Sequence, residues 1–366
     1  MSENEEKKEI DESMTDRSET ESFDKNNNEA VDPIEEAFAD APVSTERKMP
    51  VVRQLVLLSA LLFGVFSLGA LPFFVSQLNS WKSPQSASPI VSNEEIAGPD
   101  QVFIDPFADL SISAKSAIVI DLKTGEVLYE KSADQKLPLA SITKLMTALV
   151  ASEIVEAGMI VPITEEAVAQ SGDGGLKEGE RFTLSRLIDL LLLTSSNDGA
   201  FALAVAAGRT LDTEVPAEAF VQAMNIRADE LGLSSMSFRN PTGLDLTEDE
   251  AGAYGTARDV AKLLEYIVLN KPTILEETTK AGAVYGDVNG GSHNVSNTNP
   301  VVDAIPGLIG SKTGYTTLAG GNLAIAWNAG VDRPIVAVVL ASSHSGRFTD
   351  ILRLVDATKQ QLVSEE

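Results

Sequence analysis

The chain contains no cysteine among its 366 residues. It therefore has no disulfide, no thiol nucleophile and no thiolate metal site. A folded part of roughly 260 residues can be held together by core burial alone. We predict neither a metal site nor a cofactor.

Histidine is almost as scarce, with only His293 and His344 in the chain. A Ser-His-Asp mechanism needs one of them beside a suitable serine, and the sequence has no G-x-S-x-G nucleophile elbow. His293 lies in a loop-like stretch, and His344 lies between an expected strand and an expected helix. We interpret both as structural or surface residues, which leaves lysine as the candidate base for a serine nucleophile.

Basic residues are also few: 28 Lys and Arg against 54 Asp and Glu give a formal net charge of −26. Nucleic-acid binding needs a basic surface, so this composition argues against it. Residues 1–50 are especially acidic and poor in large apolar side chains. Such a segment cannot offset the entropy of folding, and we predict a disordered tail there.

Between Arg53 and Lys82 the chain carries no charge at all. Its apolar stretch is long enough to cross the roughly 30 Å hydrocarbon core of a bilayer and shows no polar face. A cleaved signal peptide would have a shorter apolar region, of about 7–15 residues, close to the N-terminus. We therefore predict a retained transmembrane helix at residues 54–78.

Three basic residues lie just before this helix, and only Lys82 lies just after it. By the positive-inside rule, the tail is expected on the cytoplasmic side and the rest of the chain outside. Residues 79–106, rich in Ser, Pro, Asn and Gln, are expected to link the helix to a folded domain at 107–366.

Strand-like runs lie at both ends of this domain. Residues 116–131 predict a hairpin around a Thr-Gly turn, residues 141–275 are mostly helical in pattern, and three further strands and an amphipathic helix follow. Because hairpins join antiparallel neighbours, we predict an α/β fold of the α+β type. One mainly antiparallel sheet is assembled from both ends of the domain, with a mostly helical subdomain inserted.

The stretch LPLASITKLMTALV places Ser141 at the start of an apolar helix and Lys144 one turn further on. Serine is a good helix N-cap, which is one interpretation of Ser141. A lysine, however, is disfavoured at the positive end of the helix dipole. A lysine at this disfavoured position suggests a catalytic role, because Lys144 could reach the hydroxyl of Ser141 on the same side of the helix.

Two further motifs follow in order along the chain. Ser195–Asn197 (SSN) lies at a break between two helices. Lys312–Gly314 (KTG) lies in an apolar strand, where a charged side chain is unexpected unless it has a function. An earlier KTG, Lys123–Gly125, is explained by turn chemistry in the first hairpin. Another S-x-x-K, Ser22–Lys25, lies in the acidic tail and is interpreted as a chance match.

The order S-x-x-K, S-x-N, K-T-G resembles the signature of penicillin-binding proteins and serine β-lactamases. The longer stretches LPLASITKLMTALV, LLLTSSNDGA, FRNPTGLD and GSKTGYTTLAGGNLAIA resemble the D-alanyl-D-alanine carboxypeptidase family of low-molecular-mass penicillin-binding proteins. The resemblance covers about Ser116 to the C-terminus. It implies a DD-peptidase/β-lactamase-like fold.

The resemblance also implies roles for the motif residues. Ser141 is expected to be the nucleophile and Lys144 its general base, with a pKa lowered by burial, by nearby Lys312 and by the helix N-terminus. Ser195 is expected to relay a proton to the leaving amine. Asn197 is expected to bind the substrate backbone.

The remaining implied roles lie on the later KTG strand. Lys312 and Thr313 are expected to hold the terminal carboxylate of the substrate, and Gly314 to leave room for it along the strand. The backbone N–H groups of Ser141 and Tyr315 are expected to form the oxyanion hole.

The implied protein is a membrane-anchored, penicillin-sensitive carboxypeptidase of the bacterial cell membrane. It would remove the terminal D-Ala from peptidoglycan stem peptides in cell wall biogenesis and be inhibited covalently by β-lactams. A DD-endopeptidase that cuts crosslinks shares the same motifs. The chain's ending soon after its last helix slightly favours the endopeptidase, whereas SSNDGA favours the carboxypeptidase.

A β-lactamase and a non-catalytic receptor fit the sequence less well. A class A β-lactamase needs an E-x-x-L-N glutamate, and the nearest string, Glu265–Asn270, has one residue too many and a helical pattern. A non-catalytic penicillin-binding receptor would signal through the tail, which shows no folded domain. The acidic tail could bind a cytoplasmic partner, but we favour a solvated tail.

The two KTG copies allow a direct test. Lys123→Ala should leave acylation of the protein by a labelled penicillin nearly unchanged. Lys312→Ala should slow it by at least about 10²-fold, the usual loss for one removed electrostatic stabiliser. Equal rates for the two variants would show that the wrong KTG has been chosen.

Overall fold

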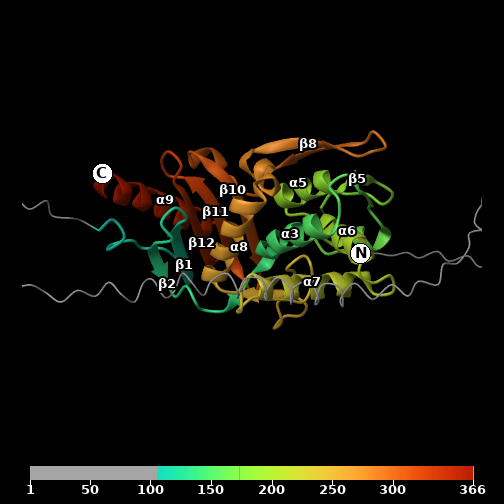
Figure 1. Ribbon diagram of the computed structural model, residues 1–366, viewed down its shortest axis with the longest axis horizontal. Helices are drawn as coiled ribbons and strands as arrows, with labels where there is room; N and C mark the ends of the chain where they lie inside the picture. Colours follow the sequence, from blue (N-terminus) through green and yellow to red (C-terminus); the bar gives the residue numbers. More distant parts are fainter. Residues whose placement is uncertain (1–104, 173, 366) are drawn as a thin grey trace, which may run out of the picture. The chain divides into compact units, whose positions relative to one another are not determined.

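The computed structural model describes residues 105–172 and 174–365 (Figure 1). The tail predicted at 1–50, the membrane helix at 54–78 and nearly all of the linker at 79–106 lie outside these residues. Within the described ranges, none of the helices combines the length and the apolar character needed to cross a bilayer.

A five-stranded antiparallel sheet is the centre of the described domain. Its strand order is β10-β11-β12-β1-β2. The strands are β1 (Ser116–Asp121), β2 (Val127–Lys131), β10 (Leu308–Thr316), β11 (Gly320–Asn328) and β12 (Pro334–Ser342). Strand β1 pairs with β12 from Ser116 opposite Leu340 to Asp121 opposite Ile335. The prediction of one sheet assembled from both ends of the domain is confirmed.

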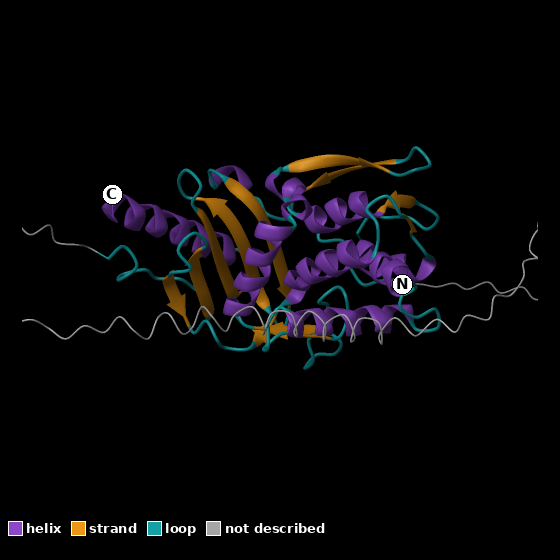
Figure 2. Cartoon of the chain, in the orientation of Figure 1, coloured by secondary structure: helices purple, strands orange, loops and turns teal. Residues whose placement is uncertain are grey.

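The central strands are apolar on both faces because a helix covers each face (Figure 2). Alternate residues of a strand point to opposite faces. Ile118 of β1 accordingly packs in one core with α8 (Ala257–Asn270), whereas Val119 packs in the other with α9 (Gly346–Glu365). This double burial explains why the strand sequences read as continuous apolar runs.

The inserted helical part surrounds α3, whose residues from Lys144 to Ala151 are all buried. Its helices are α3 (Lys144–Ile154), α4 (Glu165–Val168), α5 (Leu184–Thr194), α6 (Asn197–Gly208) and α7 (Pro216–Glu230). Small antiparallel ladders connect them: β3 (Leu137–Pro138), β4 (Ile160–Pro162), β5 (Arg181–Thr183), β6 (Ser237–Phe238), β7 (Ala253–Gly255), β8 (Gly282–Gly286) and β9 (Ser292–Ser296). Short 3₁₀ turns are η2 (Ala140–Thr143), η3 (Pro272–Ile274), η4 (Glu276–Thr279) and η5 (Val302–Ala304).

Two local expectations differ from the structure. Ser141 is not a helix N-cap: it lies inside η2, α3 begins at Lys144, and neither element has a side-chain cap. His293 is not in a loop but in β9, where its Nε2 lies 3.0 Å from Glu180 Oε1. The hydroxyl of Ser141 therefore does not cap a helix.

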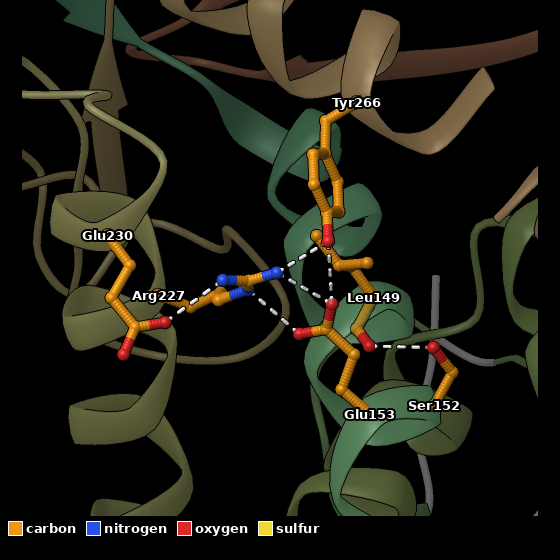
Figure 3. Close-up of polar contacts among 6 residues, drawn as sticks. All are labelled: Leu149, Ser152, Glu153, Arg227, Glu230 and Tyr266. Carbon is orange, nitrogen blue, oxygen red and sulfur yellow. Dashed lines mark hydrogen bonds and ion pairs between the residues drawn. The ribbon is translucent and has the colours of Figure 1, made fainter. Parts of the chain in front are cut away.

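A polar cluster ties α3 to α7 and α8 (Figure 3). Arg227 of α7 forms a 2.9 Å ion pair with Glu153 of α3 and donates a 2.7 Å hydrogen bond to the hydroxyl of Tyr266 of α8. Arg227 also pairs with Glu230 one turn along its own helix. The cluster joins three helices that are distant in sequence, one of which begins at Lys144.

Arg227→Met should therefore lower the free energy of unfolding by about 1 kcal/mol, the upper range for a partly exposed ion pair, because several partners are lost together. Lys280→Met, which removes a single exposed pair with Glu277, is the matched control and should change it by less than about 0.5 kcal/mol. Urea unfolding measures both. Equal losses would show that the cluster adds nothing beyond one surface pair.

Candidate active site

The structure brings the three motifs together at one end of α3. Ser141 comes from η2, Ser195 and Asn197 come from the α5–α6 junction, and Lys312 comes from β10. Turn η2 packs directly against the KTG strand: a Cβ placed on Gly314 would lie 3.1 Å from Ser141 N and 3.0 Å from Leu139 O. A glycine at this position lets the turn of Ser141 approach the strand closely.

The ammonium group of Lys144 is fully buried beside the serine. Its Nζ lies 2.8 Å from Ser141 Oγ, 2.8 Å from Asn197 Oδ1 and 2.8 Å from the carbonyl oxygen of Thr242. When Lys144 is neutral, it keeps two N–H donors for Asn197 and Thr242, and its lone pair can accept the proton of Ser141. The geometry is that of a base and its nucleophile.

Burial lowers the pKa of Lys144 to about 7, because the charged form loses its hydration, while the negative charge of Asp198 opposes this shift. Burial was one of the causes expected from the sequence. The expected effects of Lys312 and of the helix N-terminus are not among the causes of this shift. The pKa of Lys312 itself is lowered, first by its own burial and then by the charges of Lys144 and Arg347.

Lys312 is the second buried cation. Its Nζ lies 2.8 Å from Ser195 Oγ and 2.8 Å from the carbonyl oxygen of Thr313. The adjacent Thr313 hydroxyl lies 2.6 Å from that of Thr298. These groups form a polar row next to the serine of the SSN motif.

The α5–α6 junction is built by an unusual backbone conformation. Ser195 has φ of 63° in the left-handed region, and Ser196 caps α6 by accepting a hydrogen bond from Gly199 N. A non-glycine residue in that region stores strain, which is common at functional sites. The bend turns Ser195 toward Lys312 and lets Asn197 donate a 2.7 Å hydrogen bond to the carbonyl oxygen of Ser171.

Strand β10 is an edge strand of the sheet, and its outer edge lies beside this site. Ser311 N donates to Thr278 Oγ1 at 3.0 Å and so points away from β11. Because backbone groups alternate along a strand, the N–H groups of Thr313 and Tyr315 point the same way. The N–H of Tyr315 is thus on the edge expected for an oxyanion donor. Tyr315 is 51% exposed, and its ring meets that of His344 edge to face, with centroids 4.7 Å apart.

Three contributors to the site were not found from the sequence. Arg347 at the start of α9 is buried and donates a 2.7 Å hydrogen bond to the carbonyl oxygen of Gly314. Asp198 acts on Lys144 through its charge, and Thr242 binds it through a backbone carbonyl. The NPTGLD stretch marks the loop of Thr242 by its turn residues, whereas no motif marks Arg347.

The earlier KTG is remote from this site. Lys123 is exposed in the turn between β1 and β2, which is the opposite edge of the sheet from β10. Gly125 has φ of 75°, and Lys123 N donates to Asp121 Oδ1. The interpretation of this copy as turn chemistry is confirmed.

A family model described as D-alanyl-D-alanine carboxypeptidase matches residues 104–344. The chain belongs to this family. Among curated relatives, D-alanyl-D-alanine carboxypeptidase DacF of Bacillus subtilis (strain 168) is 34% identical over 263 residues, which cover 68% of the chain and 63% of DacF. A D-alanyl-D-alanine endopeptidase of Pseudomonas aeruginosa is 30% identical over 258 residues, covering 68% of the chain and 76% of that protein. The match with DacF thus spans less than two thirds of that relative's length.

Solved structures support the same fold. The crystal structure of D-alanyl-D-alanine carboxypeptidase from Mycobacterium tuberculosis H37Rv matches with a TM-score of 0.60 at 27% identity, covering 70% of the chain and 96% of that structure. The described domain therefore has the mixed α/β fold of penicillin-binding DD-peptidases, with antiparallel sheets and helices. This agrees with the fold implied by the sequence motifs.

The pKa of Lys144 predicts the pH dependence of acylation. Below about pH 7, Lys144 takes up a proton and loses the lone pair that accepts the proton of Ser141. The rate of acylation by a labelled penicillin should therefore fall about tenfold per pH unit below that midpoint and level off above it. The measured midpoint belongs to the coupled pair with Lys312. A flat profile from about pH 5 to about pH 8 would rule out a lysine base.

Proposed function

We propose that the protein is a serine-type D-Ala-D-Ala carboxypeptidase that removes the terminal D-Ala from peptidoglycan stem peptides. The observation that carries the proposal is the 2.8 Å contact between the buried Lys144 Nζ and Ser141 Oγ. A serine hydroxyl needs a base to become a nucleophile, and this lysine is held in the right place with a pKa suited to the task.

Acylation begins when neutral Lys144 takes the proton of Ser141. The Oγ then attacks the carbonyl carbon of the penultimate D-Ala. The developing oxyanion is stabilised by the N–H groups of Ser141 and Tyr315. Lys312 and Thr313 hold the terminal carboxylate and fix the direction in which the peptide lies along β10.

The tetrahedral intermediate collapses when the C–N bond breaks and D-Ala leaves as an amine. The proton it needs travels from Lys144, with the Ser195 hydroxyl as relay. The contact of Ser195 Oγ with Lys312 Nζ supports this relay, because it orients the hydroxyl. Asn197 holds the substrate backbone. Water then attacks the acyl-enzyme with Lys144 as base, which releases the shortened peptide and restores Ser141.

A DD-endopeptidase is the alternative, and the P. aeruginosa relative bears that name. The three motifs do not separate the two activities, whereas most of the similar curated relatives, DacF among them, are named carboxypeptidases. A β-lactamase is disfavoured, since the string Glu265–Asn270 is part of the continuous helix α8.

We also propose that residues 54–78 anchor the protein in a bacterial cell membrane, with 1–50 cytoplasmic and 107–366 outside. The support is the charge-free apolar run between Arg53 and Lys82 and the excess of basic residues before it. This arrangement would hold the catalytic domain next to its cell-wall substrate. Labelling of intact cells with a membrane-impermeant reagent at introduced cysteines on either side of the span tests the orientation.

The reaction type is tested with two substrates and one drug. We expect release of D-Ala from a stem pentapeptide and little cleavage of a crosslinked dimer. A penicilloyl adduct on Ser141 should last minutes or longer, because the remnant of the drug stays in the site and obstructs the attacking water. In the peptide reaction the D-Ala leaving group departs and leaves the way open. Mass spectrometry measures the released D-Ala, the products of the dimer and the penicilloyl adduct. Ser141→Ala should abolish labelling.

Three outcomes would contradict the proposal. Penicillin labelling that persists in Ser141→Ala would mean that the nucleophile is another residue. Faster cleavage of the dimer than of the pentapeptide would make the protein an endopeptidase. Loss of the adduct within seconds, with release of hydrolysed penicillin, would make it a β-lactamase.

A further inference from the structure

Asn322 of β11 carries a fully buried amide that the chemistry described above does not use. Its Nδ2 donates two hydrogen bonds of 3.0 Å, to the carbonyl oxygens of Pro138 and Leu139. Its Oδ1 accepts a 2.8 Å hydrogen bond from Ala341 N, at the end of β12. Both N–H groups of the amide therefore bind the two residues that lead into η2, the turn of the nucleophile.

The residue that follows this pair has a strained backbone. Ala140 has φ of 48°, in the left-handed region that favours glycine. A residue with a Cβ stays there only when its surroundings hold it, and such strain is common at functional sites. Because Ala140 directly precedes Ser141, its backbone angles set the direction of the peptide N–H of the nucleophile.

The carbonyl groups on both sides of this strained residue are fixed. Asn322 holds the carbonyl of Leu139, and the hydroxyl of Thr143 donates a 2.7 Å hydrogen bond to that of Ala140. Gly243, with φ of 80°, packs so closely on the Ala140 carbonyl that a side chain there would collide with it. The peptide planes before and after Ala140 are thus both held, and with them its φ and ψ.

Fixing these planes also fixes the N–H of Ser141. In a trans peptide the N–H points away from the preceding carbonyl oxygen, which here is the held oxygen of Ala140. Ser141 N lies beside β10, 3.1 Å from the position of a Cβ placed on Gly314. The next residue of that strand is Tyr315, the second donor expected for the oxyanion hole. Two donors stabilise one oxyanion only when both point to the same place.

We propose that Asn322 is a positioning residue: it holds Ala140 in its strained conformation and so directs the N–H of Ser141 into the oxyanion hole. It acts through the carbonyls of the two residues before Ala140 and, being fully buried, does not meet the substrate. The inference rests on the proposed function and deepens it, because it names the side chain on which one oxyanion donor depends.

Asn322→Leu tests this role, because it keeps the approximate size of the side chain and removes all three hydrogen bonds. We expect kcat for release of D-Ala from a stem pentapeptide to fall by about 10- to 100-fold, the order of effect of misplacing a catalytic group by about 1 Å. KM should be nearly unchanged, because the proposed carboxylate site at Lys312 and Thr313 is not altered. A rise in KM with an unchanged kcat would contradict the proposal.

Asn225 provides a matched control, because its amide makes the same set of hydrogen bonds elsewhere. It donates to the carbonyl oxygens of Val221 and Phe238 at 2.9 and 2.8 Å and accepts from Phe238 N at 2.8 Å, which links α7 to β6. Asn225→Leu should lower the free energy of unfolding, measured with urea, yet leave kcat nearly unchanged. An equal fall of kcat in the two leucine variants would make the effect one of general stability and overturn the role of Asn322.

A second substitution tests the strained residue itself. Glycine adopts a positive φ without strain, so a turn with Ala140→Gly depends less on being held. In that background Asn322→Leu should reduce kcat about fivefold less than it does when Ala140 is present, which corresponds to the strain that glycine avoids. An equal reduction in both backgrounds would show that Asn322 does not act through the conformation of Ala140.

The remaining outcomes separate this inference from the proposed function. If Asn322→Leu does not fold, Asn322→Ser, a shorter side chain with a single donor, takes its place. Failure of both variants to fold would assign Asn322 to the fold alone and overturn the inference. If the unaltered protein releases D-Ala and a folded Asn322 variant keeps its kcat, the inference is wrong and the proposed function stands. If the unaltered protein neither releases D-Ala nor is labelled by penicillin, the proposed function fails, and the inference with it.

Discussion

The structure depends on keeping two lysine ammonium groups out of water at one place. Within the residues that the structure describes, the hydrogen-bond partners of Lys144 and Lys312 are uncharged oxygens of hydroxyl, amide and carbonyl groups. A buried ammonium without a direct ion pair is costly, so each lysine gives up its proton more readily than in water. The same burial that is costly for the fold lowers the pKa of Lys144 and so suits it to the role of base that we propose.

The architecture meets this constraint by bringing three distant segments to one point. The sheet is assembled from both ends of the domain, so that β10 lies at its edge and faces the inserted helices. Gly314 lets the turn of Ser141 approach, and Arg347 holds the Gly314 carbonyl from the other side. Helix α3, fixed by Arg227 at its far end, carries Lys144 at its first position.

Much of this was accessible from the sequence, because the signals are local. Alternating and helical patterns predicted the hairpin, the sheet from both termini and the helix break at Ser195. The three motifs predicted which side chains would meet. Arg347 and Asp198 were missed because burial and electric field depend on tertiary packing, which no spacing records. His293 was misplaced because β9 is a short, half-exposed strand whose polar residues resemble those of a loop.

The proposed base must both accept and release a proton, and the surroundings of Lys144 suit both steps. If the pKa of the lysine were far below the working pH, the neutral amine would be too weak a base to take the proton of Ser141. If its pKa were far above the working pH, the amine would almost always carry a proton and could not accept another. Burial lowers the pKa of Lys144 and the charge of Asp198 raises it, and the two leave it at about 7. In the proposed reaction, acylation ends with the proton on the leaving amine and deacylation ends with it on Ser141, so Lys144 would accept and release a proton in each half of the reaction. A pKa near the working pH is the compromise that serves both steps.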